Sequence, residues 1–101
     1  MAKQRFIEVK YKVKPGKRDE FFQKVQQLGI AKASRMEPGN YRYEYVIPTE
    51  DADVIFLFEV WGTEEQQKIH ATTAHYKQLI ELKKIYVEET EIKTTEIESM
   101  G

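Results

Sequence analysis

The sequence predicts a single α+β domain, residues 1–101, with the element order β-α-β-β-α-β of the ferredoxin-like arrangement. Three observations support this prediction. Two stretches alternate apolar and polar residues, as half-buried strands do, and a third is almost wholly apolar. Two further stretches carry apolar residues at helical spacing. A chain of 101 residues, 41% of them hydrophobic, has room for one core and enough apolar side chains to build it.

The first half of the chain predicts a strand, a helix and a turn. Residues 6–14 alternate and end at Pro15-Gly16, which is typical of a strand that runs into a turn. Residues 17–35 follow helical spacing, with Gly29 placed to kink or break the helix. The inward-facing side chains are expected to be Phe21, Phe22, Val25 and Leu28. A turn is predicted over Glu37-Pro38-Gly39-Asn40.

The second half predicts two strands, two helices and a last strand. Residues 41–47 alternate, and Val54–Trp61 is nearly all apolar, which indicates a central strand. Thr63 and Gln66 have the spacing of a capping box, so a short helix is expected to about His70. Thr72 or Thr73 then caps a second helix, and residues 86–97 form an edge or exchanged strand.

Composition excludes several classes of function. The net charge of −1, from 16 basic and 17 acidic residues, argues against nucleic-acid binding. No apolar run approaches the length of a membrane span, about 20 residues. The absence of cysteine removes disulfides, thiolate catalysis and Cys-based metal sites. We therefore expect a cytoplasmic protein that interacts with neither nucleic acid nor membrane.

The predicted topology places the helices on one face of the sheet. The other face is expected to carry Tyr and Val side chains that are too apolar to remain in water. A second copy of the chain is the simplest cover, so the sequence predicts a homodimer.

Both histidines lie within one short stretch, His70-Ala71-Thr72-Thr73-Ala74-His75-Tyr76. An i,i+5 spacing does not share a helix face, so the two rings can meet only if the helix breaks at Thr72-Thr73. Otherwise His70 is a helix-end residue and His75 an amphipathic filler. No third ligand has recognisable spacing, and the chain lacks an H-E-x-x-H pattern, so no metal site is expected.

Glu59 is the one carboxylate in the apolar strand, and it shares a face with Trp61. It either reaches a sheet edge and pairs with Arg42 or Arg5, or it lines a pocket and hydrogen-bonds a histidine or a substrate. Burial would raise its pKa and suit it to proton transfer. The tyrosines Tyr41, Tyr43 and Tyr45 form either a packed or dimer face, or the wall of a pocket for a planar ligand.

Glu37-Pro38-Gly39-Asn40, Phe58-Glu59-Val60-Trp61 and the His70–Tyr76 segment, in this order and spacing, resemble the antibiotic biosynthesis monooxygenase (ABM) family. The resemblance extends from about residue 5 to 97. It implies a dimeric α+β barrel, in which two ferredoxin-like sheets close against each other. Some members oxidise quinols or polyketide anthrones with O₂ and without metal or flavin, some degrade haem, and one branch isomerises a phosphorylated autoinducer.

The resemblance implies cofactor-independent oxygenation of a small phenolic or quinol substrate. His70 or His75 would take the phenol proton, with Glu59 as the third catalytic residue. The substrate would be held by Trp61, Tyr76, Asn40 and Tyr43. Haem degradation is disfavoured, because the first strand lacks the asparagine that haem degraders use.

Two alternatives remain at this point. An isomerase of the phospho-autoinducer type would need a basic group near the pocket, and Lys32, Arg35 or Lys77 facing inward would favour it. A non-enzymatic module for small ligands would use the His-Tyr segment only to shape a pocket.

Overall fold

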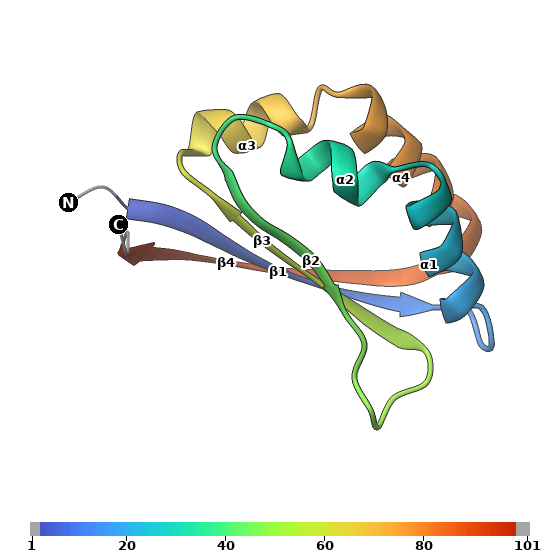
Figure 1. Ribbon diagram of the computed structural model, residues 1–101. Coiled ribbons are helices and arrows are strands. Elements are labelled where there is room, and N and C mark those ends of the chain that lie inside the picture. The colour runs from blue at the N-terminus through green and yellow to red at the C-terminus, as the bar shows by residue number, and fades with distance from the viewer. Residues whose placement is uncertain (1–2, 99–101) are drawn as a thin grey trace.

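Helices cover one face of a four-stranded antiparallel sheet (Figure 1). The structure is a computed structural model that describes residues 3–98, so the ends of the predicted domain 1–101 lie outside the described residues. The strand order β2-β3-β1-β4 confirms the predicted ferredoxin-like α+β fold. In chain order the elements are β1 (Lys3–Val13), α1 (Arg18–Gln27), α2 (Ile30–Arg35), β2 (Asn40–Val46), β3 (Val54–Trp61), α3 (Glu64–His70), α4 (Ala74–Tyr86) and β4 (Val87–Glu98).

Strands β1 and β3 form the centre of the sheet, as the apolar composition of β3 predicts. Alternation along β1 turns Ile7, Val9 and Tyr11 toward the helices, where all three are buried. Val9 pairs with Leu57 of β3, which is also buried. The core thus lies between these two strands and the helical layer.

Gly29 breaks the first helical segment into α1 and α2, as the sequence predicts. Its φ of +67° is a left-handed conformation that side chains with a Cβ rarely adopt. The break changes which side chains face the core. Leu28 was predicted to face inward, but it is 45% exposed, and Ile30, the first residue of α2, is fully buried instead.

Threonine caps start both α3 and α4, and the second of them confirms the predicted break between the histidines. The Thr63 hydroxyl oxygen accepts the Gln66 backbone N–H at 3.1 Å and starts α3. Thr73 starts α4 by accepting the Tyr76 N–H at 3.2 Å. The same Thr73 hydroxyl donates to the His70 carbonyl at 2.7 Å, so one side chain ends α3 and begins α4.

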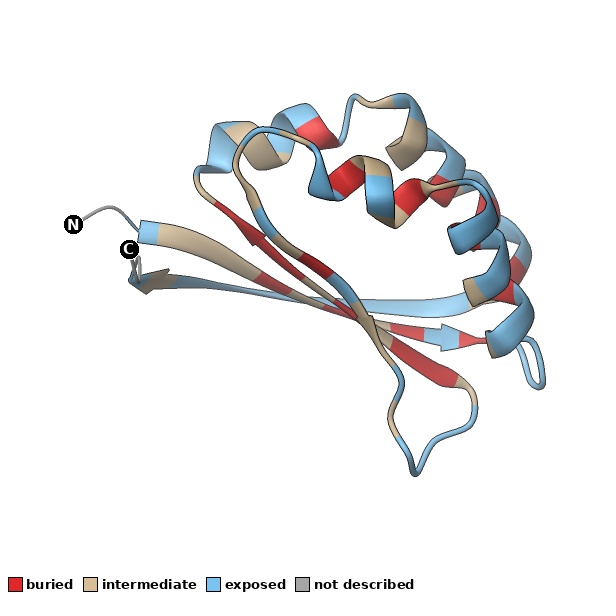
Figure 2. Cartoon of the chain, in the orientation of Figure 1, coloured by how far each residue is buried: buried red, intermediate tan, exposed pale blue. Residues whose placement is uncertain are grey.

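The two faces of the sheet differ from the prediction in their aromatic residues. Tyr43 packs on the helical side, where it is only 1% exposed. The uncovered face instead carries the three half-buried phenylalanines Phe6, Phe56 and Phe58. The prediction of Tyr and Val side chains on the open face was therefore wrong for the tyrosines, because the alternation of β2 directs Tyr43 and Tyr45 toward the helices. It was right for the valines, since Val54 and Val60 share the open face with Phe6. Strand β4 is exposed along almost its whole length (Figure 2).

Candidate active site

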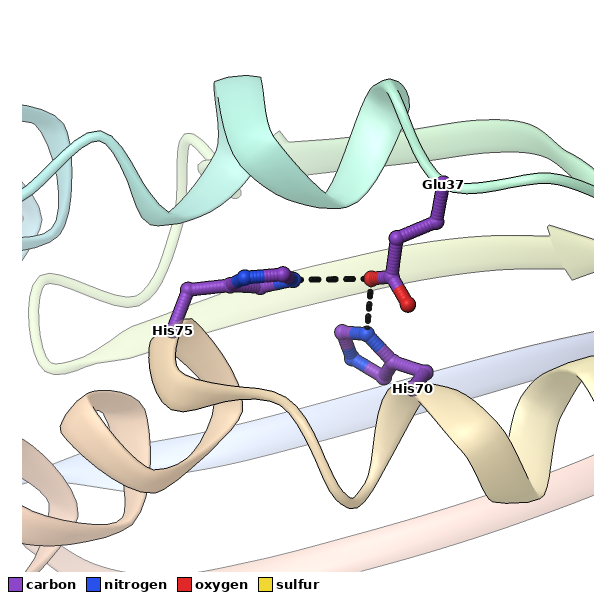
Figure 3. A group of neighbouring side chains, drawn as sticks. All are labelled: Glu37, His70 and His75. Atoms are coloured by element: carbon purple, nitrogen blue, oxygen red, sulfur yellow. Dashed lines mark hydrogen bonds and ion pairs between the residues drawn. The ribbon is translucent and has the colours of Figure 1, made fainter.

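One carboxylate oxygen joins the two histidines (Figure 3). Glu37 Oε2 lies 2.5 Å from His70 Nδ1 and 2.8 Å from His75 Nε2. The three side chains are 11%, 6% and 16% exposed, respectively. The rings come from the end of α3 and the first turn of α4, and they meet because the chain breaks between these helices, as the sequence requires.

Glu37 reaches the histidines from the loop between α2 and β2. Its backbone carbonyl accepts the Asn40 N–H at 3.2 Å, which closes the predicted turn. Gly39 within this turn has a φ of +82°, and its carbonyl accepts the Gly62 N–H at 2.8 Å. The loop is thereby tied to the end of β3, which sets the position from which Glu37 extends.

The hydrogen bonds assign the tautomer of each ring. An ionised carboxylate only accepts, so His70 Nδ1–H and His75 Nε2–H must both donate to Glu37. In a neutral His70 ring the free electron pair then lies on Nε2, which has no hydrogen-bond partner within residues 3–98. This arrangement, with one imidazole nitrogen fixed by a carboxylate and the other available, is the geometry of a general base.

Aromatic side chains hold the His70 ring in place. Its centroid lies 4.8 Å from that of Trp61, 5.2 Å from that of Tyr76 and 5.6 Å from that of Tyr43. Trp61 is fully buried beneath the ring. The imidazole is therefore fixed by ring packing as well as by Glu37.

Glu59 is buried on the helical face of β3, and its Oε1 accepts the Trp61 indole N–H at 2.9 Å. Burial raises the pKa of the Glu59 carboxyl above its ordinary range, while the Trp61 hydrogen bond and the nearby His70 partly oppose this effect. Of the two sequence alternatives, the structure supports the pocket: Arg5 bonds Gln67 and Arg42 bonds Glu44 instead of Glu59.

A cavity of about 130 Å³ lies between the sheet and helices α3 and α4. Of the predicted site residues, four line it: Tyr43, Glu59, His70 and Tyr76. Trp61, His75 and Asn40 are not among the lining residues. Trp61 supports His70 from behind, His75 contacts Glu37, and the Asn40 amide donates to the Arg42 carbonyl of its own strand at 3.0 Å.

Three residues that were not predicted as site residues belong to this site: Glu37, Tyr11 and Lys83. Tyr11 and Lys83 line the cavity from β1 and α4, and their alternation and helical spacing place them on core-facing positions. Glu37 begins one of the motifs that carry the family resemblance, but the sequence gave its side chain no role. It lies 33 residues before His70, and only the folded sheet brings the two together.

The site also contains a set of donors that could hold a divalent cation, formed by Glu37, His70 and His75. One ligand atom of each residue lies within 4.8 Å of the other two. Glu37 supplies the third donor that sequence spacing did not reveal. In this arrangement both imidazole N–H groups already donate to the one carboxylate oxygen. A cation would have to replace both hydrogen bonds and take nitrogen electron pairs in their stead.

Comparisons with known proteins agree with the resemblance read from the sequence. Residues 5–82 match the profile of the family described as antibiotic biosynthesis monooxygenase. YcnE of Bacillus subtilis, whose name provisionally assigns it as a monooxygenase, is 36% identical over 66 residues, which cover 65% of this chain and 67% of YcnE.

Solved structures with lower identity share the fold. PA3566 of Pseudomonas aeruginosa superposes with a TM-score of 0.87 at 15% identity, over 98% of both chains. A Nitrosomonas europaea protein, also provisionally named an antibiotic biosynthesis monooxygenase, gives 0.81 at 23% identity, over 96% of this chain and 90% of that one. The matched profile covers most of the chain, and this protein belongs to the antibiotic biosynthesis monooxygenase family.

Proposed function

We propose that this protein is a cofactor-independent monooxygenase of a small phenolic or quinol substrate, with His70 as the base that removes the phenol proton. The observation that carries the proposal is the bond from His70 Nδ1 to Glu37, which leaves Nε2 as the basic atom of a ring that lines the cavity. A carboxylate behind the imidazole stabilises the ring once it has taken the proton.

The reaction balances without an external reductant. Removal of the phenol proton by His70 gives an electron-rich ring that reduces O₂ and forms a carbon–oxygen bond, which yields a hydroperoxide. Its O–O bond then breaks, one oxygen stays on the ring as a quinone carbonyl, and the other leaves as water. Both electrons and both hydrogens of that water come from the substrate. Glu59, whose pKa is raised by burial, can relay the proton that His70 has taken from the substrate to the departing oxygen, so that both residues return to their starting state.

The remaining side chains would bind and position the substrate. Tyr43 and Tyr76 line the cavity on either side of His70 and would pack against the ring. Trp61 would keep both His70 and Glu59 in place, since it contacts each of them. His75 is given a positioning role, because its Nε2 bonds Glu37 and it does not line the cavity.

Oxygen uptake with a panel of quinols, measured with and without a chelator, tests the proposal. His70→Gln is expected to lower kcat by about 10²- to 10⁴-fold, the usual contribution of a general base. His75→Gln removes only the positioning bond to Glu37 and should lower kcat by less than His70→Gln does. No uptake across the panel refutes the oxygenase, and loss of activity with the chelator refutes the cofactor-free mechanism. A larger loss in His75→Gln than in His70→Gln would transfer the role of base to His75.

The isomerase alternative has one observation in its favour. The basic residues expected to serve it do not line the cavity: Lys32 and Arg35 line a separate pocket beside α2, and Lys77 lies on the outer side of α4. Lys83, however, does line the cavity, and this is the observation that favours the isomerase. An isomerase would turn over a phosphorylated dione without oxygen uptake, and that difference separates the two functions.

A further inference from the structure

Lys83 is a half-buried cation without a carboxylate partner in the part of the chain that the structure describes. It lies on α4 and lines the same cavity as His70, with its Nζ 5.1 Å from the centre of the Tyr11 ring. Within residues 3–98 no carboxylate oxygen lies within 4.0 Å of this ammonium group. The neighbouring Lys84, by contrast, is exposed and bonds Glu81 at 2.9 Å. Partial burial lowers the pKa of the Lys83 ammonium group, and no charged neighbour among the described residues offsets this effect.

Lys83 and the proton-transfer groups lie at opposite ends of the cavity. The Lys83 ammonium group lies over the ring of Tyr11 on β1. Glu59 of β3 pairs in register with Ile7, which is also on β1. Four residues of a strand, from Ile7 to Tyr11, span about 13 Å. The cavity is therefore polar at both ends, with a base and a carboxyl group at one end and a single cation at the other.

The wall between these ends is apolar and the space is small. Aliphatic side chains from both strands and from α4 line it, namely Ile7, Val9, Leu57, Leu79 and Ile80. The volume of about 130 Å³ is close to that of an engineered cavity of about 150 Å³ that binds benzene. A space of this size accommodates one aromatic ring.

We propose that Lys83 binds an anionic substituent of the ligand, so that the cavity selects a single-ring phenol that carries a carboxylate or phosphate group at the end remote from its hydroxyl. The phenol hydroxyl meets His70, the ring lies against the aliphatic wall, and the anion pairs with the otherwise uncompensated ammonium group. The inference rests on the cavity assigned under the proposed function, but it concerns binding and needs no turnover.

Binding of three probes tests the assignment: 4-hydroxybenzoate, its uncharged counterpart 4-hydroxybenzamide, and 4-hydroxyphenyl phosphate. Titration calorimetry or NMR shift perturbation measures the three Kd values at one ionic strength. The wild type is expected to bind at least one anionic probe about tenfold or more tightly than the amide, as a charge-assisted contact predicts. The carboxylate and phosphate arms identify which anion Lys83 takes.

Lys83→Met is expected to abolish the preference for the anion while affinity for the amide stays within about twofold. Lys84→Met is the matched control and should behave as the wild type, because its ammonium group lies on the surface. Lys83→Gln, which keeps a polar group, serves if the Met variant does not fold. The proposal is overturned if no probe binds the wild type, if the wild type shows no preference, or if the preference survives in either Lys83 variant.

The two proposals fail separately. Loss of the anion preference in Lys83→Met, together with no oxygen uptake by the wild type, would refute the oxygenase and leave the anion subsite intact. Conversely, oxygen uptake from uncharged quinols together with an unchanged probe preference in Lys83→Met would support the oxygenase and refute the anion subsite.

Discussion

At the scale of single residues, Glu37 decides what the two histidines can do. Both imidazoles donate to the same oxygen, so neither can turn the bonded nitrogen toward a substrate without losing that bond. The rings are nevertheless unequal. His70 lines the cavity and His75 does not, although the sequence presents them as an equivalent pair.

The tautomer of His70 is the first prediction. Long-range ¹H–¹⁵N NMR spectra are expected to show His70 protonated at Nδ1 and unprotonated at Nε2 at a pH where the ring is neutral, because Glu37 accepts from Nδ1. In Glu37→Gln the amide can donate as well as accept, so this tautomer should lose its dominance. Glu88→Gln, on an exposed position of β4, controls for loss of one negative charge. A His70 that stays in the Nε2–H form in the wild type contradicts the assignment.

Glu59 makes folding stability depend on pH in a direction opposite to that of a paired surface carboxylate. Its raised pKa means that the folded chain holds this proton more tightly than the unfolded chain does. The contribution of Glu59 to the free energy of unfolding therefore falls as pH rises from about 4.5 through the raised folded-state value, and stays low above it.

Glu59→Gln should remove this dependence. The amide oxygen can still accept the Trp61 indole N–H, and the cost of a buried charge disappears. Relative to the wild type, the variant is expected to gain stability progressively above pH 4.5, by about 1.4 kcal/mol for each pKa unit of the shift. Urea unfolding across a pH series measures the difference, with Glu88→Gln as control. A difference that stays flat or falls with rising pH would refute the buried-carboxyl interpretation.

At the scale of elements, local signals predicted well and distant ones did not. The caps at Thr63 and Thr73 act on residues three positions away, so their spacing alone predicts both helix starts and the break that brings the histidines together. The contact between Glu37 and His70 crosses 33 residues. It depends on how β2 aligns with β3, which no local spacing encodes. The sequence therefore indicated a turn and a family motif at Glu37, but not its contact with the histidines.

Gly39 tests how that turn is built. A Cβ added there would overlap the side-chain amide of Gln66 and would also occupy a backbone conformation with φ of +82°. Gly16 has a similar φ of +75° with open space around it, so Gly16→Ala measures the backbone strain alone. That strain is expected to cost about 1–3 kcal/mol.

Gly39→Ala should lower the free energy of unfolding by more than Gly16→Ala does, because it adds displacement of Gln66. Chemical denaturation measures both, and Gln66→Ala combined with Gly39→Ala should recover the difference. Equal losses in the two single variants would show that Gln66 makes no close approach. The His70 NMR signals should move only in Gly39→Ala, since Glu37 belongs to that turn.

At the scale of the whole molecule, the uncovered face of the sheet divides into two regions. Phe6, Phe56 and Phe58 form an apolar patch, with ring centroids 5.9 Å apart for the Phe6–Phe58 and the Phe56–Phe58 pairs. Beside it, β1 and β4 present opposite charges in register, such as Lys10 opposite Glu91. Among the described residues, no helix is long and apolar enough to cross a membrane.

We propose that a second copy of the chain covers the phenylalanine patch, as the sequence also predicts. Sedimentation equilibrium is then expected to give twice the chain mass of 12.0 kDa for the wild type. Phe58→Glu would place a carboxylate in the centre of the apolar patch and should yield a folded monomer, because Phe58 lies on the open face and not among the buried core residues.

Ile69→Glu is the matched control: Ile69 is 61% exposed on α3, on the opposite side of the sheet, so that variant should remain dimeric. A monomeric wild type, or a Phe58→Glu variant that still forms dimers, would show that the patch is not the interface. Because the cavity lies on the helical side, probe binding by the Phe58→Glu monomer would further show that one chain is sufficient to form it.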